Sequence, residues 1–244
     1  MTSHDTRSGS SFRMRWSAQW VRSMFDRIAT RYDLANHVLS LGLDRYWRLR
    51  MARCLSSRTD GRILDVCTGT GDSLLCMDHP WAMRAGLDFS AMMLTRARRK
   101  SRTRGIAAVW VRGDATSLPF PDATFDAVTI AFGLRNLEHP RRGLEEFHRV
   151  LRPGGTCIVL EFTLPRWRPW RWVYGFYLRR ILPVIGTVLT GDRSAYRHLV
   201  ESILEFPHYH DLAVWLTETG FTDVRFVPLT GGVATLYVGK KVPG

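Results

Sequence analysis

Five apolar, strand-like runs alternate with helix-like segments between residues 62 and 162, and this alternation limits the folds open to the chain. The runs lie within RILDVCTGTGD, RAGLDFS, IAAVWVRGDA, FDAVTIAFGL and GTCIVLEF. Parallel strands need a helical crossover between them, so the pattern predicts an α/β fold with a mostly parallel, doubly wound sheet and helices on both faces. One more helix and two closing strands are expected in DLAVWLTETGFTDVRFV and GGVATLYVGKK.

Local signals place several further elements. Ser90 is expected to cap a helix over SAMMLTRARRK, and DSLLCMDHPWAM also has a helical pattern. The RPGG signal at 152–155 predicts a turn before the fifth strand. Apolar residues at helical spacing, from Met24 to Leu43, predict helices ahead of the sheet.

The composition favours one globular domain over residues 21–244, because 244 residues with 45% apolar content can bury a sizeable core. Residues 1–20 lack the apolar run of a secretory signal and are expected to form a disordered basic tail. No later segment has enough uncharged residues to span a bilayer. The four cysteines show no metal-ligand spacing, which predicts reduced thiols, no metal site and a cytoplasmic location.

The net charge of +13 could attract nucleic acid, anionic lipid or acidic small molecules. Nearly all of this charge is Arg, which does not choose among these partners. No RNA-binding module is recognisable and the aromatic residues gather in one amphipathic stretch, so nucleic acid is not expected, although an RNA methyltransferase stays a rival interpretation.

Polar side chains follow the predicted strands where each strand ends. Ligands of open α/β sheets bind beyond the carboxyl ends of the strands, so one crevice should gather these residues. Asp88 ends the second strand and is placed to accept hydrogen bonds from a ribose diol. The strand-end set is Asp65, Gly69, Thr70, Gly71, Asp88, Asp114, Arg135 and Asn136.

The glycine-rich turn differs from a dinucleotide fingerprint. Leu74 stands where that pattern needs Gly or Ala, and Asp72 would set a carboxylate beside a pyrophosphate. S-adenosylmethionine fits better, because its sulfonium and ammonium groups favour neighbouring carboxylates. Asp114 adds an acceptor where an adenine amino group could lie. A packing turn with a capping Asp is the plainer alternative.

Several motifs together closely resemble the UbiE/MenG family of quinone-biosynthesis C-methyltransferases over residues 24–241. They are FDRIATRYDLANHVLSLGLDRYWR, DVCTGTGD, GLDFSAMML, GDATSLPFPDATFDAVTIAFGLRNL, EFHRVLRPGG, AYRHLVESI and LTGGVATLYVG. The resemblance implies a class I methyltransferase fold with a Rossmann-like, mostly parallel seven-stranded sheet. It also implies S-adenosylmethionine as the methyl donor and a polyprenyl benzoquinol or naphthoquinol as the acceptor, with a paralogue for another phenolic or polyketide acceptor left open.

Carried over to this chain, the resemblance implies a set of cofactor-binding residues. Asp114 stands where many relatives have Asn, and Ala131 where relatives typically have Ser, so one cofactor hydrogen bond is expected to be absent. The expected set is Asp65, Gly69, Thr70, Gly71, Asp88, Phe89, Asp114, Ala115 and Ala131.

Arg135 and Asn136 are the expected catalytic residues, because methylation of an aromatic carbon is helped when a guanidinium stabilises phenolate charge on the ring. The alternative for Arg135 is an ion pair with a strand-end carboxylate. Tyr32 and Asp33 are further catalytic candidates, with a core aromatic residue and a helix cap as their alternatives. The candidates for a base are His37, Glu138 and His139, whose alternative is a solvated surface.

Residues 165–183, PRWRPWRWVYGFYLRRILP, predict an amphipathic helix from Pro169. Its aromatic face holds Trp170, Val173, Tyr174, Tyr177 and Ile181, and its opposite face is rich in Arg. Three interpretations are open: contact with an anionic membrane at its inner face, a lid on the acceptor side over residues 165–200, and an ordinary packed helix. The sequence also leaves a homodimer open.

Overall fold

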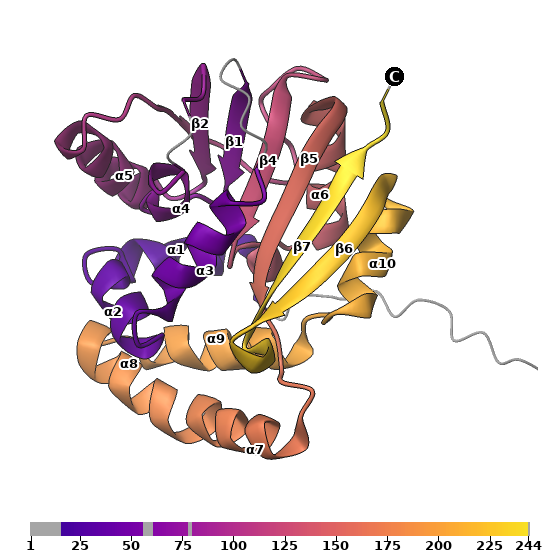
Figure 1. Ribbon diagram of the computed structural model, residues 1–244. Helices are drawn as coiled ribbons and strands as arrows, with labels where there is room; N and C mark the ends of the chain where they lie inside the picture. Colours follow the sequence, from indigo (N-terminus) through magenta and orange to yellow (C-terminus); the bar gives the residue numbers. More distant parts are fainter. Residues whose placement is uncertain (1–15, 56–60, 78–79, 244) are drawn as a thin grey trace, which may run out of the picture.

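A seven-stranded sheet with the strand order β3-β2-β1-β4-β5-β7-β6 forms the centre of the molecule (Figure 1). The computed structural model describes residues 16–55, 61–77 and 80–243. Its first five strands are parallel, and only the last strand of the chain runs antiparallel to both of its neighbours, which confirms the predicted mostly parallel sheet. The strands are β1 (Arg62–Val66), β2 (Met83–Asp88), β3 (Val109–Arg112), β4 (Phe125–Ala131), β5 (Leu151–Phe162), β6 (Phe221–Leu229) and β7 (Ala234–Lys241).

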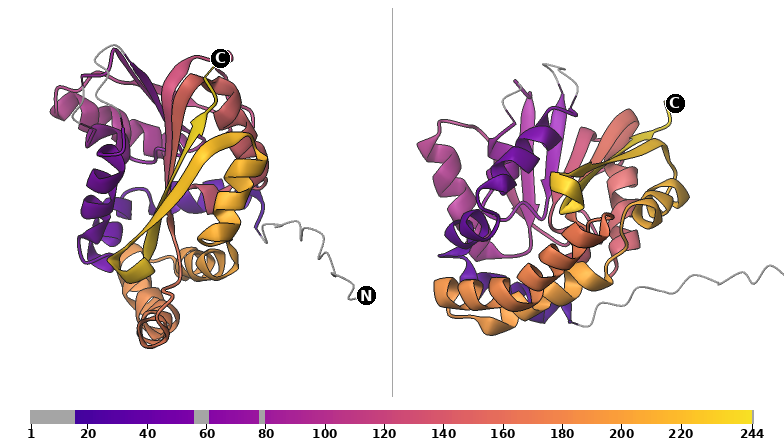
Figure 2. Two further views of the ribbon diagram at one scale, coloured as in Figure 1. Left: turned by 45° about the vertical axis from the view of Figure 1, so that its right-hand side comes forward. Right: turned by 60° about the horizontal axis from the view of Figure 1, so that its bottom comes forward.

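Helices cover both faces of this sheet (Figures 1 and 2). Successive strand residues point to opposite sides, so Ile63 belongs to one hydrophobic core and Leu64 to the other. Burial on both faces explains why the parallel strands are continuous apolar runs. One face carries α3 (Leu43–Ala52), α4 (Asp72–Leu75) and α5 (Ala91–Thr103), and the other α6 (Pro140–Val150) and α10 (His210–Glu218).

A second helical layer, here called the cap, lies beyond the carboxyl ends of the parallel strands (Figures 1 and 2). Two separate parts of the chain build it, and they meet where α2 contacts α8. The cap consists of α1 (Ala18–Ile28), α2 (Tyr32–Leu39), α7 (Arg168–Phe176), a π-helical turn (Tyr177–Ile181), α8 (Leu182–Thr190) and α9 (Arg193–Glu205).

Ser90 caps α5 as expected, since its hydroxyl accepts from the amide of Met93. Two local predictions are wrong. The helix expected over DSLLCMDHPWAM is only one turn, because the amides of Ala82 and Met83 already bond Gly61 and lead into β2. The RPGG turn is a bulge inside β5, where Gly154 takes φ +76° and the pairing with β4 shifts.

The predicted tail falls largely on residues 1–15, which lie outside the described residues. Within 16–20 the prediction is wrong, because α1 begins at Ala18 and is capped by the Ser17 hydroxyl. Trp20 stacks on Trp16 with a ring separation of 4.2 Å. These aromatic contacts explain why the helix extends ahead of residue 21.

Trp110 on β3 fills the space between β2 and the glycine-rich turn. It lies opposite Gly86 in the strand register, and a Cβ added at Gly86 would lie 2.5 Å from the Trp110 ring. A Cβ at Gly71, in the turn itself, would lie 2.7 Å from the same ring. Both glycines are therefore needed for Trp110 to support the turn.

We expect Gly86→Ala to destabilise the fold by about 1–3 kcal/mol, because the added methyl group overpacks the space that Trp110 occupies. Thermal unfolding followed by Trp fluorescence measures the effect. The control is Gly175→Ala in α7, where the nearest atom to an added Cβ is Arg179 Nη1 at 3.4 Å. An unchanged melting temperature for Gly86→Ala would contradict the packing argument.

Candidate active site

The turn after β1 is fixed by two buried carboxylates. Asp65 accepts hydrogen bonds from Thr68 Oγ1 at 2.6 Å and Thr129 Oγ1 at 2.7 Å. Asp88 accepts from the amides of Gly69 at 2.8 Å and Ser90 at 2.9 Å. Burial raises the pKa of each carboxyl to about 6, despite these donors. The two strand ends thus hold the turn in one position.

A cavity of about 230 Å³, here called the cofactor cavity, lies beside this turn. Six of the nine residues expected to bind the cofactor line it, namely Gly69, Asp88, Phe89, Asp114, Ala115 and Ala131. Asp65, Thr70 and Gly71 do not line it: Asp65 bonds Thr68 at the start of the turn, and Gly71 leaves room for the Trp110 ring. Asp114 holds Thr116 through Oδ1, which leaves Oδ2 for a ligand.

The charges of the cofactor cavity fit S-adenosylmethionine. Its lining includes the carboxylates of Asp88, Asp114 and Glu138, and none of the described lining residues is Lys or Arg. A cationic sulfonium and an ammonium are favoured there, whereas a pyrophosphate would be repelled. Phe89 and Met93 add apolar surface for a purine ring.

Lys100 fastens the cap to the glycine-rich turn. Its ammonium donates to Thr70 Oγ1 at 2.8 Å and to Asp72 Oδ1 at 2.7 Å, and lies 2.7 Å from Asp33 Oδ2. Thr70 in turn donates to Asp33 at 2.6 Å. Thr70 and Asp33 are thus engaged with each other, and neither lines the two cavities described here. Their positions favour an anchoring role over direct contact with cofactor or acceptor.

A second cavity of about 400 Å³, here called the acceptor cavity, lies between the strand ends and the cap. Its walls are mostly aliphatic and aromatic and come from α1, α2, α3, α7, α8 and α9. It adjoins the cofactor cavity, since both are lined by Phe25, Tyr32, Phe132 and Asn136. A ring bound in one cavity therefore lies next to a ligand in the other.

Arg135 lies on the acceptor-cavity wall, in the 3₁₀ turn that follows β4 (Leu134–Asn136). It is 5% exposed and its Nη1 pairs with Glu161 Oε1 at 2.7 Å. Nε donates to Ser202 Oγ at 3.3 Å, and Nη1 also donates to the Phe132 carbonyl. The ion pair anticipated as an alternative is present, yet these contacts leave Nη2 for a ligand. Arg135 can therefore form the structural ion pair and still offer one donor group to a ligand.

Phe132 takes a left-handed backbone conformation with φ +59° where β4 ends. This conformation is costly for a residue with a bulky side chain. Its ring packs 4.4 Å from that of Phe162, and Phe132 lines both cavities. The strained residue thus forms an aromatic wall at the junction of the two cavities.

Asn136 also lies at this junction and its amide is oriented by two contacts. Nδ2 donates to the Phe132 carbonyl at 3.3 Å, and Oδ1 lies 3.0 Å from His198 Nε2. Burial, and then the charge of Arg135, lower the pKa of His198 to about 4, so the imidazole is neutral near pH 7 and donates from Nε2. His198 and Glu161 were not anticipated from the sequence.

Tyr32 lines both cavities, a position compatible with the catalytic role considered for it. Burial raises the pKa of its hydroxyl, partly offset by Asn36, Arg48 and Arg135. Of the candidate bases, His37 bonds Asp44 at 2.9 Å and does not line the acceptor cavity. Glu138 and His139 lie at the exposed edge of the cofactor cavity.

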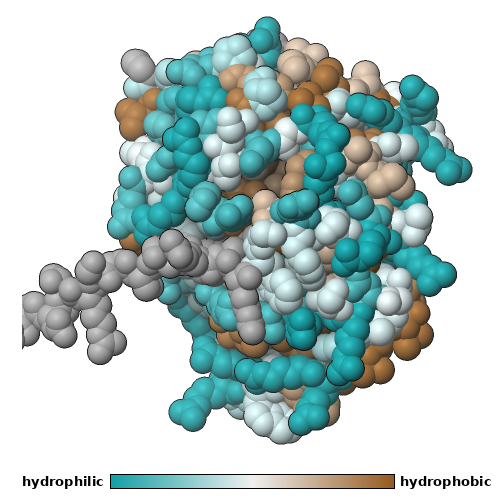
Figure 3. All heavy atoms as spheres, turned by 180° about the vertical axis from the view of Figure 1, so that it is seen from behind, coloured by the Kyte–Doolittle hydropathy of each residue, from teal (hydrophilic) through white to brown (hydrophobic). Residues whose placement is uncertain are grey.

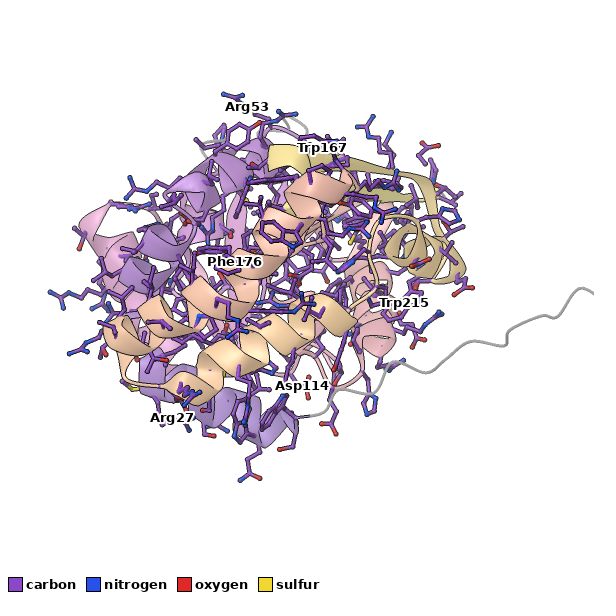
Figure 4. All side chains as sticks on the ribbon, turned by 90° about the horizontal axis from the view of Figure 1, so that it is seen from below. Arg27, Arg53, Asp114, Trp167, Phe176 and Trp215 are labelled. Atoms are coloured by element: carbon purple, nitrogen blue, oxygen red, sulfur yellow. The ribbon has the colours of Figure 1, made fainter. Side chains whose placement is uncertain are left out.

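The amphipathic segment lies against the acceptor cavity. All five residues of its predicted aromatic face, Trp170, Val173, Tyr174, Tyr177 and Ile181, line that cavity. Seen from below, α7 and α9 run across this side of the molecule, with Trp167 just before α7 and Phe176 at its end (Figure 4). The aromatic face of this segment therefore covers the acceptor cavity, the position anticipated for a lid on the acceptor side.

Residues 13–241 match the model of the ubiE/COQ5 methyltransferase family. The chain belongs to the ubiE/COQ5 methyltransferase family. It is 44% identical over 220 residues to a demethylmenaquinone methyltransferase of Thermus thermophilus, covering 89% of this chain and 100% of that protein. It is 41% identical to the ubiquinone/menaquinone biosynthesis C-methyltransferase UbiE of Geobacter sulfurreducens, over 94% of this chain and 91% of that protein.

Solved structures confirm the fold of this family member. A SAM-dependent methyltransferase from Thermotoga maritima matches with a TM-score of 0.65 and 18% identity, covering 91% of this chain and 99% of that chain. One from Aquifex aeolicus matches with a TM-score of 0.60 and 17% identity, covering 93% and 100%. The ubiE/COQ5 enzyme is thus a class I, S-adenosylmethionine-dependent C-methyltransferase, as the sequence resemblance implied.

We expect cofactor affinity to fall about tenfold between pH 7.5 and pH 5, because a carboxyl with a pKa near 6 becomes protonated over this range and loses its charge. Only the ionised Asp88 can accept from a ribose diol with both oxygens. Calorimetric titration with S-adenosylmethionine measures the change. Asp88→Asn should bind weakly at both pH values, and full pH dependence in that variant would assign the effect to another group.

Proposed function

We propose that the acceptor cavity binds the ring of a polyprenyl quinol, and that the quinol is a naphthoquinol. As a ubiE/COQ5 family member, the enzyme catalyses S-adenosylmethionine-dependent C-methylation in menaquinone or ubiquinone biosynthesis. Both relatives described above carry menaquinone in their names, which favours a naphthoquinol over a benzoquinol as the acceptor. The observation that carries the proposal is Arg135, a buried guanidinium in an aromatic cavity that adjoins the cofactor cavity.

Arg135 would act on the electron density of the acceptor ring. When bound, S-adenosylmethionine supplies an electrophilic methyl group on a positively charged sulfur. The ring carbon attacks best when a neighbouring hydroxyl has lost its proton, and Nη2 of Arg135 would stabilise the resulting phenolate. Since the guanidinium stays protonated, it stabilises charge rather than taking the proton. Glu161 keeps this guanidinium in place and neutralises the buried charge before the acceptor binds.

Asn136 would orient the acceptor ring. One of its two N–H groups bonds the Phe132 carbonyl, so the other is left at the junction of the cavities. His198 prevents the amide from rotating, because its Nε2–H needs the carbonyl oxygen of Asn136. A donor that is already fixed in place can hold the acceptor ring in the geometry that methyl transfer needs.

We further propose that the mouth of the acceptor cavity contacts an anionic membrane, from which the polyprenyl tail enters. Four cavity-lining residues are also exposed at this mouth, namely Leu41 (86%), Phe176 (52%), Val173 (47%) and Ile181 (38%). Trp172 stacks on Phe176 at 6.3 Å and lies in a groove with Arg168, Arg171, Arg179 and Arg180. Exposed aromatic and Arg side chains together suit a headgroup boundary.

The neighbouring helix extends this apolar surface. Val184 and Val188 of α8 are 63% and 77% exposed. Seen from behind, apolar residues reach the surface at the lower right of the molecule, next to hydrophilic ones (Figure 3). Among the described helices, none is long and apolar enough to cross a membrane. Contact through the rim of the cavity is the arrangement that these exposures support.

We expect Arg135→Gln and the double variant Arg135→Gln/Glu161→Gln to lower methylation of a polyprenyl naphthoquinol about 10²- to 10³-fold, the usual loss when a charge-stabilising donor is removed. The double variant leaves no unpaired buried charge, so it separates catalysis from stability. Labelled S-adenosylmethionine and mass spectrometry of the quinol measure turnover. Cofactor affinity should be unchanged, and recovery of activity in the double variant would make Arg135 a structural residue.

We expect Trp172→Ser/Phe176→Ser to weaken binding to phosphatidylglycerol vesicles about tenfold or more, given the value of burying an aromatic side chain in lipid. Arg168→Glu/Arg180→Glu should weaken binding at low salt and remove its salt dependence. Sedimentation with vesicles measures both. Val109→Ser, on the edge strand β3, is the matched control, because Val109 is 51% exposed. Equal binding by all variants would disprove the membrane contact.

A further inference from the structure

We propose that Arg48 forms a subsite for a carboxylate, and that it binds the α-carboxylate of the cofactor's amino-acid portion. The proposal rests on the cofactor assignment and not on the nature of the acceptor. S-adenosylmethionine carries one carboxylate, yet the cofactor cavity presents carboxylates and, among its described lining residues, no Lys or Arg. An α-carboxylate therefore needs a cation from beyond that cavity.

The size of the cofactor cavity points in the same direction. Sites for drug-sized ligands usually enclose about 300–1,000 Å³, whereas this cavity encloses about 230 Å³. A nucleoside fits such a space, and the rest of the cofactor can extend into the adjoining cavity. Tyr32, Phe132 and Asn136 line both cavities and mark this passage.

Arg48 lies at the passage from the glycine-rich turn to the acceptor cavity. It belongs to α3, is 8% exposed and lines the acceptor cavity. Nε donates to Ser73 Oγ at 3.2 Å, in the short helix that follows the turn. Its guanidinium carbon lies 5.7 Å from the centre of the Phe132 ring. The side chain thus contacts the short helix that follows the turn, and Phe132, which also lines the cofactor cavity.

The contacts of Arg48 leave one donor group for a ligand. Nη1 pairs with the buried carboxylate of Asp44, which also accepts from Ser40 Oγ at 2.9 Å and lies 2.9 Å from His37 Nδ1. Neither this ion pair nor the bond to Ser73 uses Nη2. The planar fork of Arg can bind a carboxylate from this side without losing its own partner.

The other cations near the passage are less suitable. Lys100 has three N–H donors and three close oxygens, on Thr70, Asp72 and Asp33. Arg135 is bonded to Glu161 and Ser202, and its guanidinium packs 5.2 Å from the Phe162 ring, on the acceptor side. Its surroundings suit the acceptor, so Arg48 is the guanidinium best placed for the cofactor.

The test compares S-adenosylmethionine with its decarboxylated analogue, which keeps the sulfonium and the amine. Calorimetric titration gives both affinities without turnover. We expect the wild-type chain to prefer S-adenosylmethionine about 10- to 100-fold, the range for one charge-assisted hydrogen bond to a buried cation. In Arg48→Gln this ratio should fall close to one, because the carboxylate has lost its partner.

Matched variants separate this subsite from a structural effect. Arg48→Lys keeps the charge and the ion pair with Asp44, so it should fold like the wild type and retain part of the preference. Arg45→Gln, on the exposed side of the same helix, should leave the ratio unchanged. Melting temperatures show whether each variant is folded.

Two results would overturn the proposal. One is an unchanged affinity ratio in folded Arg48→Gln, including the case in which both ligands bind equally more weakly. Arg48 would then be a structural residue. The other is loss of the preference in Arg135→Gln/Glu161→Gln, which would place the carboxylate at Arg135. Neither depends on methylation of a quinol, so failure of the proposed acceptor would be seen separately.

Discussion

The buried ion pair between Arg135 and Glu161 connects the ends of β4 and β5 at the point where the sheet meets the cap. Both side chains are almost fully enclosed, so each supplies the counter-charge that offsets the burial of the other. Around this pair the chain places Phe132 in a strained conformation and fixes the amide of Asn136. The pair therefore places a charge at the wall of the acceptor cavity, beside the residues that form this wall.

A common wall between the two cavities is the organising feature of the site. It is formed by residues from the first cap helices and from the end of β4, notably Tyr32, Phe132 and Asn136. On one side of it the lining is acidic, and on the other it is aromatic with two buried guanidinium groups, Arg48 and Arg135. This difference in charge favours a cationic methyl donor in the cofactor cavity and an uncharged ring in the acceptor cavity.

Much of the fold followed from local sequence signals. The strand runs, the carboxylates that end β1 and β2, and the Ser90 cap depend on residues close to one another in the chain. The bulge in β5 did not follow, because an RPGG sequence specifies a bend but not whether the neighbouring strand continues to pair across it.

The site was predicted less completely, because its decisive contacts are distant in sequence. Arg135 and Glu161 lie 26 residues apart, and only the parallel register of β4 and β5 brings them together. The acid near the end of GTCIVLEF was the available signal for Glu161. The aromatic face of residues 168–181 was recognised correctly as apolar, but its partner, the cavity under the cap, exists only in the folded chain.

The edges of the two cavities differ in a way that bears on how products depart. Exposed polar residues, Asp114, Glu138 and His139, border the cofactor cavity, whereas Leu41, Val173 and Phe176 border the mouth of the acceptor cavity. With the ligands placed as we propose, the demethylated cofactor would leave to water through the first opening and the apolar, methylated product through the second. Two separate exits do not require the cap to move away from the sheet, so Lys100 can keep α2 bonded to the turn.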